Sequence, residues 1–304
     1  MEAPSRILDI QLSSNGYDLQ MTPDRLGWLT PTDPGTPMAQ LREQYQEQGY
    51  LWLKGILPRQ KVLDFRRRYF TSFMETGLVH RDFDPVEGIY SGGGEARVAI
   101  NRALMTFVRT AAYEAFCLME EMWRFYDVFL EGDSYLHKRK IVRHTRPQDK
   151  TCTGAHYDLI YLRGGTDRVV TSWIPIGDIP VEMGGLIYLE GSDAWGRKME
   201  ADYQVNSAHL ATNERVSAYN RYMDNSGWMT KDLPALADRV GTRWLIADYE
   251  TGDMMVHSPY MIHASTVNLD PRGRIRLSTD IRYQRVKDEI DARWQNHWSL
   301  DDML

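Results

Sequence analysis

Cysteine is scarce in this sequence: only Cys117 and Cys152 occur among 304 residues. Two cysteines cannot build a disulfide framework, which excludes the small disulfide-stapled secreted folds. Cys117 stands in an apolar, helical context and is expected to be a small core residue. The cysteine count fits a reducing, cytoplasmic location, and the first twenty residues show no basic-then-apolar leader pattern.

The sequence also lacks an excess of positive charge and a long apolar run. The formal net charge is −6, so no overall basic field attracts nucleic acid or anionic lipid. No window is apolar over the length that a membrane span requires. We therefore expect a small-molecule partner, with no nucleic acid and no membrane. A homodimer is compatible with these features, and none of them selects an oligomeric state.

Repeats and low-complexity linkers are absent as well, which favours a single domain over residues 1–304. Apolar residues at helical spacing dominate residues 1–136, with helices predicted at 37–48, 58–76 and 103–130 and a strand at 50–57. Residues 137–288 hold short strand-like segments between Gly, Pro and Asp turns, interrupted by a helical insertion at about 195–240. Residues 289–304 form a C-terminal tail. This order predicts an α+β fold, a mainly β core with flanking helices.

The segment "GAHYDLIYL", residues 154–162, places a histidine and an aspartate two positions apart among strand-forming residues. On a strand, His156 and Asp158 share one face. His263 follows much later, in "YMIHASTVN". Two histidines and one carboxylate form the facial triad of non-haem iron(II) oxygenases, which leaves coordination positions open. Ordinary surface residues on an edge strand are the alternative, and His257 in "GDMMVHSP" is a competing ligand.

A second pattern lies in "DPRGRIRLSTDIRYQ", residues 270–284, which alternates as a strand. One face of this strand carries Arg274, Arg276, Ser278, Asp280 and Arg282. A solvated outer face is one interpretation. In the other, Arg276 and Ser278 form an Arg-x-Ser pair, whose guanidinium and hydroxyl bind a carboxylate. Such a pair suits the far carboxylate of 2-oxoglutarate while its keto-acid end chelates iron.

Taken together, these blocks resemble the phytanoyl-CoA dioxygenase family of Fe(II)/2-oxoglutarate-dependent oxygenases. The resemblance runs through "QYQEQGYLWLKGIL", "HYDL", "SWIPIGDIPVEMGGLIYLEGSD", "GDMMVHSPYMIHASTVN" and "RIRLSTDIRYQ". It implies a double-stranded β-helix core (a jelly roll, cupin-like) that uses Fe(II) as cofactor and 2-oxoglutarate and O₂ as cosubstrates. It also implies His156, Asp158 and His263 as the iron ligands at the catalytic centre.

For the cosubstrate, the resemblance implies Arg276 and Ser278. Arg274 is the alternative, because it stands eleven residues after His263, a spacing also seen in the family. Trp173, in "SWIP", matches a family tryptophan that borders the cosubstrate, although an ordinary core tryptophan is an equal interpretation. Tyr157 and Arg143 are candidate substrate residues, and residues 195–239 are a candidate lid over the mouth of the β core.

The resemblance predicts a dioxygenase that oxidises a C–H bond of a small molecule, by hydroxylation, desaturation or rearrangement, in natural-product biosynthesis. Two departures from the family argue against phytanoyl-CoA itself as substrate. The frequent Gly-Ser-His is here Gly191, Ser192 and Asp193, and no basic cluster suited to CoA is evident. A zinc-dependent cupin-like hydrolase or isomerase with the same ligands is an alternative, but it leaves the Arg-x-Ser pair without a task. A non-catalytic jelly-roll binding protein is another.

Overall fold

Two facing β-sheets form the core of the protein in a computed structural model that describes residues 9–147, 149–221, 227–302 and 304. The larger sheet has the order β4-β10-β7-β12-β5, and β6 pairs with the same edge of β12 as β5 does. The smaller sheet has the order β11-β8-β9-β3, and a separate pair, β1-β2, lies outside both. Neighbouring strands are antiparallel, except that β3 and β9 are parallel.

The strands are short, apart from β12. The larger sheet consists of β4 (Tyr50–Leu53), β5 (Ser134–Leu136), β6 (Ile141–Thr145), β7 (Val170–Pro175), β10 (Met254–His257) and β12 (Arg276–Arg285). The smaller sheet consists of β3 (Leu26–Trp28), β8 (Leu186–Leu189), β9 (Trp244–Ile246) and β11 (His263–Ser265), and the separate pair is β1 (Ser13–Ser14) and β2 (Tyr17–Asp18).

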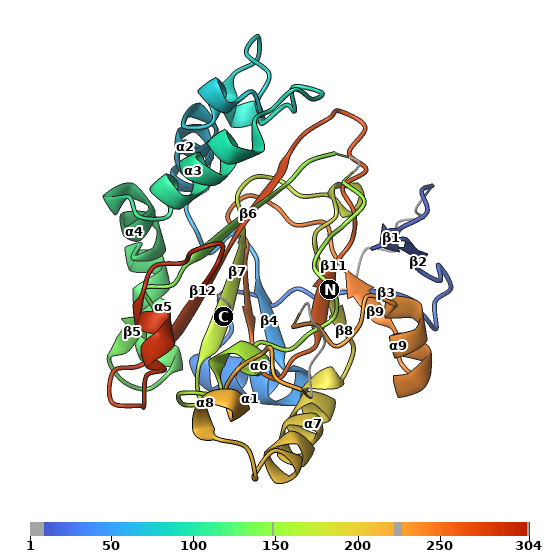
Figure 1. Cartoon of the computed structure of the whole chain (residues 1–304), viewed down its shortest axis with the longest axis vertical. Coiled ribbons are helices and arrows are strands. Elements are labelled where there is room, and N and C mark those ends of the chain that lie inside the picture. The colour runs from blue at the N-terminus through green and yellow to red at the C-terminus, as the bar shows by residue number, and fades with distance from the viewer. Residues whose placement is uncertain (1–8, 148, 222–226, 303) are drawn as a thin grey trace.

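Helices from the first half of the chain cover the outer face of the larger sheet (Figure 1). Three apolar side chains point into this helical layer and are fully buried there: Ile275, just before β12, and Leu277 and Ile281 within it. The intervening residues of β12 therefore point the other way, into the space between the two sheets. The layer consists of α1 (Met38–Gln48), α2 (Arg59–Thr71), α3 (Arg97–Phe107), α4 (Ala111–Cys117) and α5 (Glu120–Phe129), with the 3₁₀ turns η1 (Met74–Thr76) and η2 (Pro85–Glu87).

The remaining helices lie around the smaller sheet and the open end of the core. In Figure 1, α9 stands on the side of the molecule opposite α2–α5, and α7 and α8 lie at the bottom of the view. This group consists of α6 (Leu159–Leu162), α7 (Ser192–Asn206), α8 (Thr212–Arg215) and α9 (Leu233–Val240), with the 3₁₀ turns η3 (Val181–Met183) and η4 (Ala292–Gln295). In the described part of the chain, no helix has both the length and the apolar character needed to cross a bilayer.

The predicted α+β jelly roll is confirmed, and most predicted elements are present. The helix expected at 37–48 ends where Gly49 adopts a left-handed φ of 78°. The helix expected at 103–130 is three helices and begins earlier, at Arg97. Cys117 is buried, as expected, and both cysteines are free. The predictions for the start of the chain and for the helical insertion include residues 1–8 and 222–226, which lie outside the described residues.

One strand prediction is wrong, at the segment that drew attention in the sequence. Ala155 and His156 make only isolated bridges, and the chain then turns at Asp158 into the short helix α6. A short apolar run is ambiguous between strand and helix, and tertiary packing decides. Here Leu159, Ile160 and Leu162 are all buried in the core around the smaller sheet. His156 and Asp158 therefore come together through this turn, and not through strand alternation.

Candidate metal centre and adjoining cavities

His156, Asp158 and His263 converge in the interior of the protein. Their ligand atoms all lie within 4.8 Å of one another. Asp158 Oδ1 is 3.8 Å from Nε2 of His156 and 3.8 Å from Nε2 of His263. All three residues are buried. The isolated bridge between His156 and His263 brings these distant segments together.

The hydrogen bonds of the two rings determine which nitrogen faces the site. His156 Nδ1 lies 2.9 Å from the Gly154 carbonyl oxygen, and His263 Nδ1 lies 2.9 Å from that of Met261. A carbonyl oxygen only accepts, so each Nδ1 carries the proton and each Nε2 presents its lone pair. Burial lowers the pKa of both imidazoles. Both rings are thus neutral near pH 7, the form that binds a metal ion.

Asp158 is held as an oriented anion. Its Oδ2 accepts a hydrogen bond from the Thr171 hydroxyl, and Arg282 Nη2 donates to both carboxylate oxygens at 3.0 Å. Burial alone would raise the pKa of Asp158, but Arg282 and a hydrogen bond from His257 hold it well below its usual range. The carboxylate is therefore ionised, and Oδ1 faces the two histidines.

His257, the competing ligand in the sequence, lies behind Asp158. Its Nε2 is 3.4 Å from Asp158 Oδ2, and its Nδ1 is 2.8 Å from the Tyr188 hydroxyl. It is not part of the group of converging ligand atoms. The structure thus places His257 as a support for the carboxylate rather than as a member of the triad.

The polar face of β12 points into the core beside this triad. Arg276, Ser278, Asp280 and Arg282 are all buried, so a solvated outer face is the wrong interpretation for these four residues. Arg276 Nη1 lies 3.3 Å from Ser278 Oγ, and Nη2 donates to Thr145 Oγ1 at 2.6 Å. Its Nε is buried and has no hydrogen-bond partner within the described ranges. Burial lowers the pKa of Arg276 to about 10, so it stays charged near pH 7.

A small cavity connects Arg276 to the triad. Its wall includes His156 and His263, together with Trp173 and Arg276. Trp173 is buried and also packs against the ring of Tyr249 at a centroid distance of 4.7 Å, so it belongs both to the core and to the cavity wall. Arg274 lies just before β12, and its Nε donates to Asp270 at 3.1 Å. It does not line the cavities around the triad. The structure brings Arg276 to the triad, and not Arg274.

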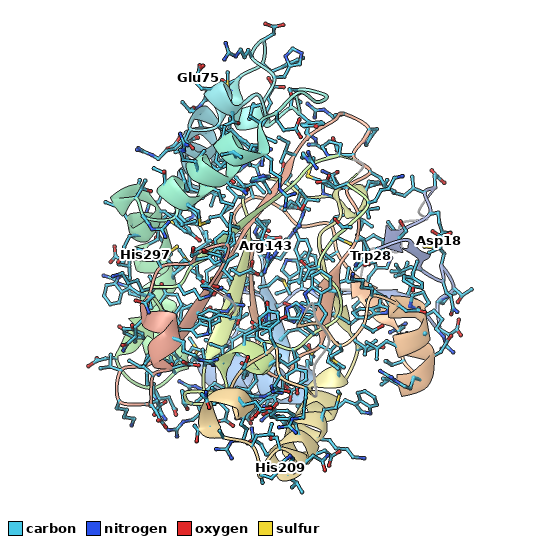
Figure 2. The ribbon with its side chains drawn as sticks, in the orientation of Figure 1. Asp18, Trp28, Glu75, Arg143, His209 and His297 are labelled. Atoms are coloured by element: carbon cyan, nitrogen blue, oxygen red, sulfur yellow. The ribbon has the colours of Figure 1, made fainter. Side chains whose placement is uncertain are left out.

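The two candidate substrate residues have different surroundings. The Tyr157 hydroxyl donates to Glu200 Oε2 at 2.9 Å, and Arg163 binds the same carboxylate at 2.8 Å. Tyr157 is buried in this network and does not line the three cavities around the triad. Arg143, on β6, lines the cavity with Arg276 and two larger ones beside it. Figure 2 shows Arg143 near the centre of the view, unlike Glu75 and His209 at its edges.

The contribution of the C-terminal tail to the site was not predicted from the sequence. A cavity of about 240 Å³ borders His156 and Asp158, and the C-terminal tail forms part of its wall through Trp294 and Trp298. The candidate lid also contributes, through Tyr219 and Trp228. The dense aromatic spacing of "RWQNHW" was the one available sign that the tail is more than an extension.

A family model and several solved structures are similar to this chain. The family model for phytanoyl-CoA dioxygenase (PhyH) matches residues 45–275. No curated protein sequence matches the chain. Several solved structures share the fold at low sequence identity, and at these identities the likeness concerns the jelly-roll fold alone.

Three of these structures cover most of the chain. The non-heme alpha ketoglutarate dependent carbocyclase SnoK from nogalamycin biosynthesis is 16% identical, with a TM-score of 0.54, over 86% of this chain and 89% of its own. The epimerase SnoN, in complex with Fe³⁺, alpha ketoglutarate and nogalamycin RO, is 15% identical, with a TM-score of 0.53, over 83% and 85%. EctD from S. alaskensis, with bound Fe, is 12% identical, with a TM-score of 0.52, over 92% and 89%.

Proposed function

This chain belongs to the phytanoyl-CoA dioxygenase family, and on that premise we propose that it is an Fe(II)- and 2-oxoglutarate-dependent dioxygenase acting on a small molecule. The convergence of two neutral imidazole nitrogens and one ionised carboxylate within 4.8 Å carries this proposal. Nitrogen and carboxylate donors in this set suit iron(II) and leave positions open for a cosubstrate and O₂.

In this proposal, His156, Asp158 and His263 hold the iron. When bound, iron(II) with 2-oxoglutarate and O₂ supplies an oxidant for a C–H bond, with succinate and CO₂ as coproducts. The surrounding residues keep the ligands in position. The carbonyl oxygens of Gly154 and Met261 hold the two rings, and Arg282 holds the carboxylate. Such supporting contacts determine ligand orientation and metal affinity.

Arg276 binds the far carboxylate of 2-oxoglutarate in this account. Its free buried Nε, its charge and its place on the cavity wall with both histidines support the assignment. Ser278 and Thr145 fix the guanidinium and offer hydroxyl groups to the same carboxylate. Trp173 supplies an apolar wall that excludes water beside the cosubstrate.

The reaction we propose is hydroxylation, desaturation or rearrangement of a natural product. SnoK and SnoN, which share the fold, come from nogalamycin biosynthesis, and this supports natural-product chemistry here. A zinc hydrolase would use the same triad but would give the buried Arg276 no carboxylate of a cosubstrate to bind. We also propose that the chain forms one oxygenase domain and works in the cytoplasm, where its two free cysteines stay reduced.

Succinate formation tests the proposal. Protein loaded with Fe(II) should convert 2-oxoglutarate to succinate in air, slowly without substrate, and zinc-loaded protein should not. If the zinc-loaded protein hydrolyses a substrate and the iron-loaded protein forms no succinate, the protein is the hydrolase instead.

A further inference from the structure

Beside the metal centre, the cavity wall carries an excess of positive charge. Arg139, Arg143 and Arg282 line the cavity of about 240 Å³, and among the described residues Asp158 is the one acidic side chain in the same wall. A second cavity of about 330 Å³ meets it at Arg143, and the part of its wall that the structure describes adds Arg276 and no acidic side chain. Volumes of this size suit a small organic molecule.

Most of these charges are already matched. Arg282 is paired with Asp158, and Arg276 is assigned to 2-oxoglutarate in the proposed function. Arg139 forms an ion pair with Asp302 of the C-terminal tail, although its Nε is buried without a partner among the described residues. Burial and the charges of Arg282 and Arg143 lower the pKa of Arg139 to about 10. The guanidinium groups therefore repel one another, and an anion between them would be stabilised.

Arg143 is the cation best placed to bind such an anion. Its Nε forms an ion pair with Asp280 Oδ2 at 3.1 Å, which holds the guanidinium in place and leaves its two terminal nitrogens to face the cavities. Its terminal nitrogens have no protein partner within the described ranges, and its side chain is 41% exposed at the junction of the two cavities. A guanidinium anchored in this way presents two parallel N–H groups, the geometry that a carboxylate accepts.

Aromatic rings form much of the remaining wall. Trp228 and Trp298 line both cavities, and Tyr219 and Trp294 line the smaller one. The Trp294 ring lies under two guanidinium groups, at 5.2 Å from Arg139 and 4.9 Å from Arg282. Flat aromatic faces make large contacts with a planar ligand at little cost in side-chain entropy. The wall thus combines a cation with surfaces for a ring system.

We propose that the substrate is a planar organic acid, whose carboxylate is bound by Arg143 and whose ring system lies against Trp228 and Trp298. This inference rests on the proposed function and names the substrate class of the same site. The two cavities meet at Arg143, and the smaller one is bordered by His156 and Asp158, so an acid bound at Arg143 lies next to the metal centre. In the competing assignment, Arg143 binds 2-oxoglutarate and not the substrate.

Calorimetric titration with matched probes tests this inference. The probes are benzoate, 2-naphthoate and anthracene-2-carboxylate, each paired with its primary amide, which keeps the shape and removes the charge. They are titrated without O₂ into protein that holds Fe(II) and saturating 2-oxoglutarate. The variants are Arg143→Met and Arg143→Lys, and the control is Arg124→Met, which removes an exposed arginine paired with Glu120 on α5.

At least one acid should bind the unaltered protein about 10-fold or more tightly than its amide, as expected for a charge-assisted hydrogen bond. Arg143→Met should abolish that preference, Arg143→Lys should keep part of it, and Arg124→Met should keep all of it. Equal binding of acids and amides, or binding of neither, would overturn the inference. The inference would also be overturned if the Arg143→Met protein bound 2-oxoglutarate more weakly and still preferred the acid to its amide.

Loss of the proposed function gives a different result. The charge-transfer absorption of the iron and 2-oxoglutarate complex is read in the same samples before each titration. A protein that lacks this absorption fails the proposed function, whereas one that shows it without acid preference fails only the inference about the substrate.

Discussion

His156 and His263 exchange two backbone hydrogen bonds, with N···O distances of 3.1 and 2.9 Å, and their rings lie 4.2 Å apart. The backbone contact thus brings together two ligands from distant parts of the chain. Each ring then turns its Nε2 toward Asp158 because its own Nδ1 donates to a nearby carbonyl oxygen. The orientation of both imidazole rings therefore depends on local backbone geometry at each histidine.

The choice between Arg276 and Arg274 can be tested directly. We expect Arg276→Met to weaken 2-oxoglutarate binding by about 10- to 100-fold, because it removes a buried charge-assisted contact. Arg274→Met should change it by less than about 3-fold, since that guanidinium is bound to Asp270 outside the cavity walls. Titration of the anaerobic iron protein with 2-oxoglutarate measures both. The reverse order of effects would assign the cosubstrate to Arg274.

Arg282 should control metal affinity through Asp158. Replacing it with Met removes both hydrogen bonds at 3.0 Å to the carboxylate and leaves Asp158 less well oriented. We expect Fe(II) affinity to fall by about 10- to 100-fold, the usual effect of losing a supporting contact to a ligand. A chelator competition measures the affinity.

Arg285→Met, at the end of the same strand, is the matched control for Arg282. Its side chain pairs with Asp288 near the surface, and the variant should bind Fe(II) as the unaltered protein does. Unchanged Fe(II) affinity in Arg282→Met, with the fold intact, would show that Asp158 does not need this support.

His144 should make the stability of the protein depend on pH. Burial lowers its pKa to about 4, and its Nδ1 lies 2.6 Å from the Tyr69 hydroxyl. In the unfolded chain the ring takes up a proton near pH 6.5, which the folded protein excludes down to about pH 4. The free energy of unfolding therefore falls as the pH drops through this window, by about 1.4 kcal/mol per pH unit.

The comparison with His144→Gln isolates this contribution. Between pH 7 and pH 5, the unaltered protein should lose about 2 kcal/mol more stability than the variant does. Urea denaturation at the two pH values measures the difference. An equal loss in both proteins would mean that His144 is protonated in the folded state or is not buried.

The strand β12 shows what the sequence can and cannot predict. Alternation placed Arg276, Ser278, Asp280 and Arg282 on one face, and the structure agrees. The alternation does not predict whether that face points to solvent or to the core, because this depends on which side of the sheet the helices α2–α5 cover. The resemblance to the dioxygenase family predicted that this face points to the core, because its Arg-x-Ser pair matches residues that bind the cosubstrate.

Two other features depend on contacts between distant segments. The run from Leu159 to Leu162 has the composition of a strand, yet it packs as a helical turn, which local propensity does not distinguish over so few residues. Arg139 and the tail around Trp294 form a wall of the site only because the chain folds back across the open end of the core. Neither follows from local sequence alone.

The charge-transfer absorption of the anaerobic complex tests the central claim most directly. Protein loaded with Fe(II) and 2-oxoglutarate without O₂ should show a visible metal-to-ligand band, since in the proposed function the cosubstrate chelates an iron held by His156, Asp158 and His263. His156→Ala should lack this band, and His80→Ala, at a partly exposed histidine outside the cavity walls, should keep it. A folded, iron-loaded protein without the band, or a His156→Ala variant that retains it, would contradict the account.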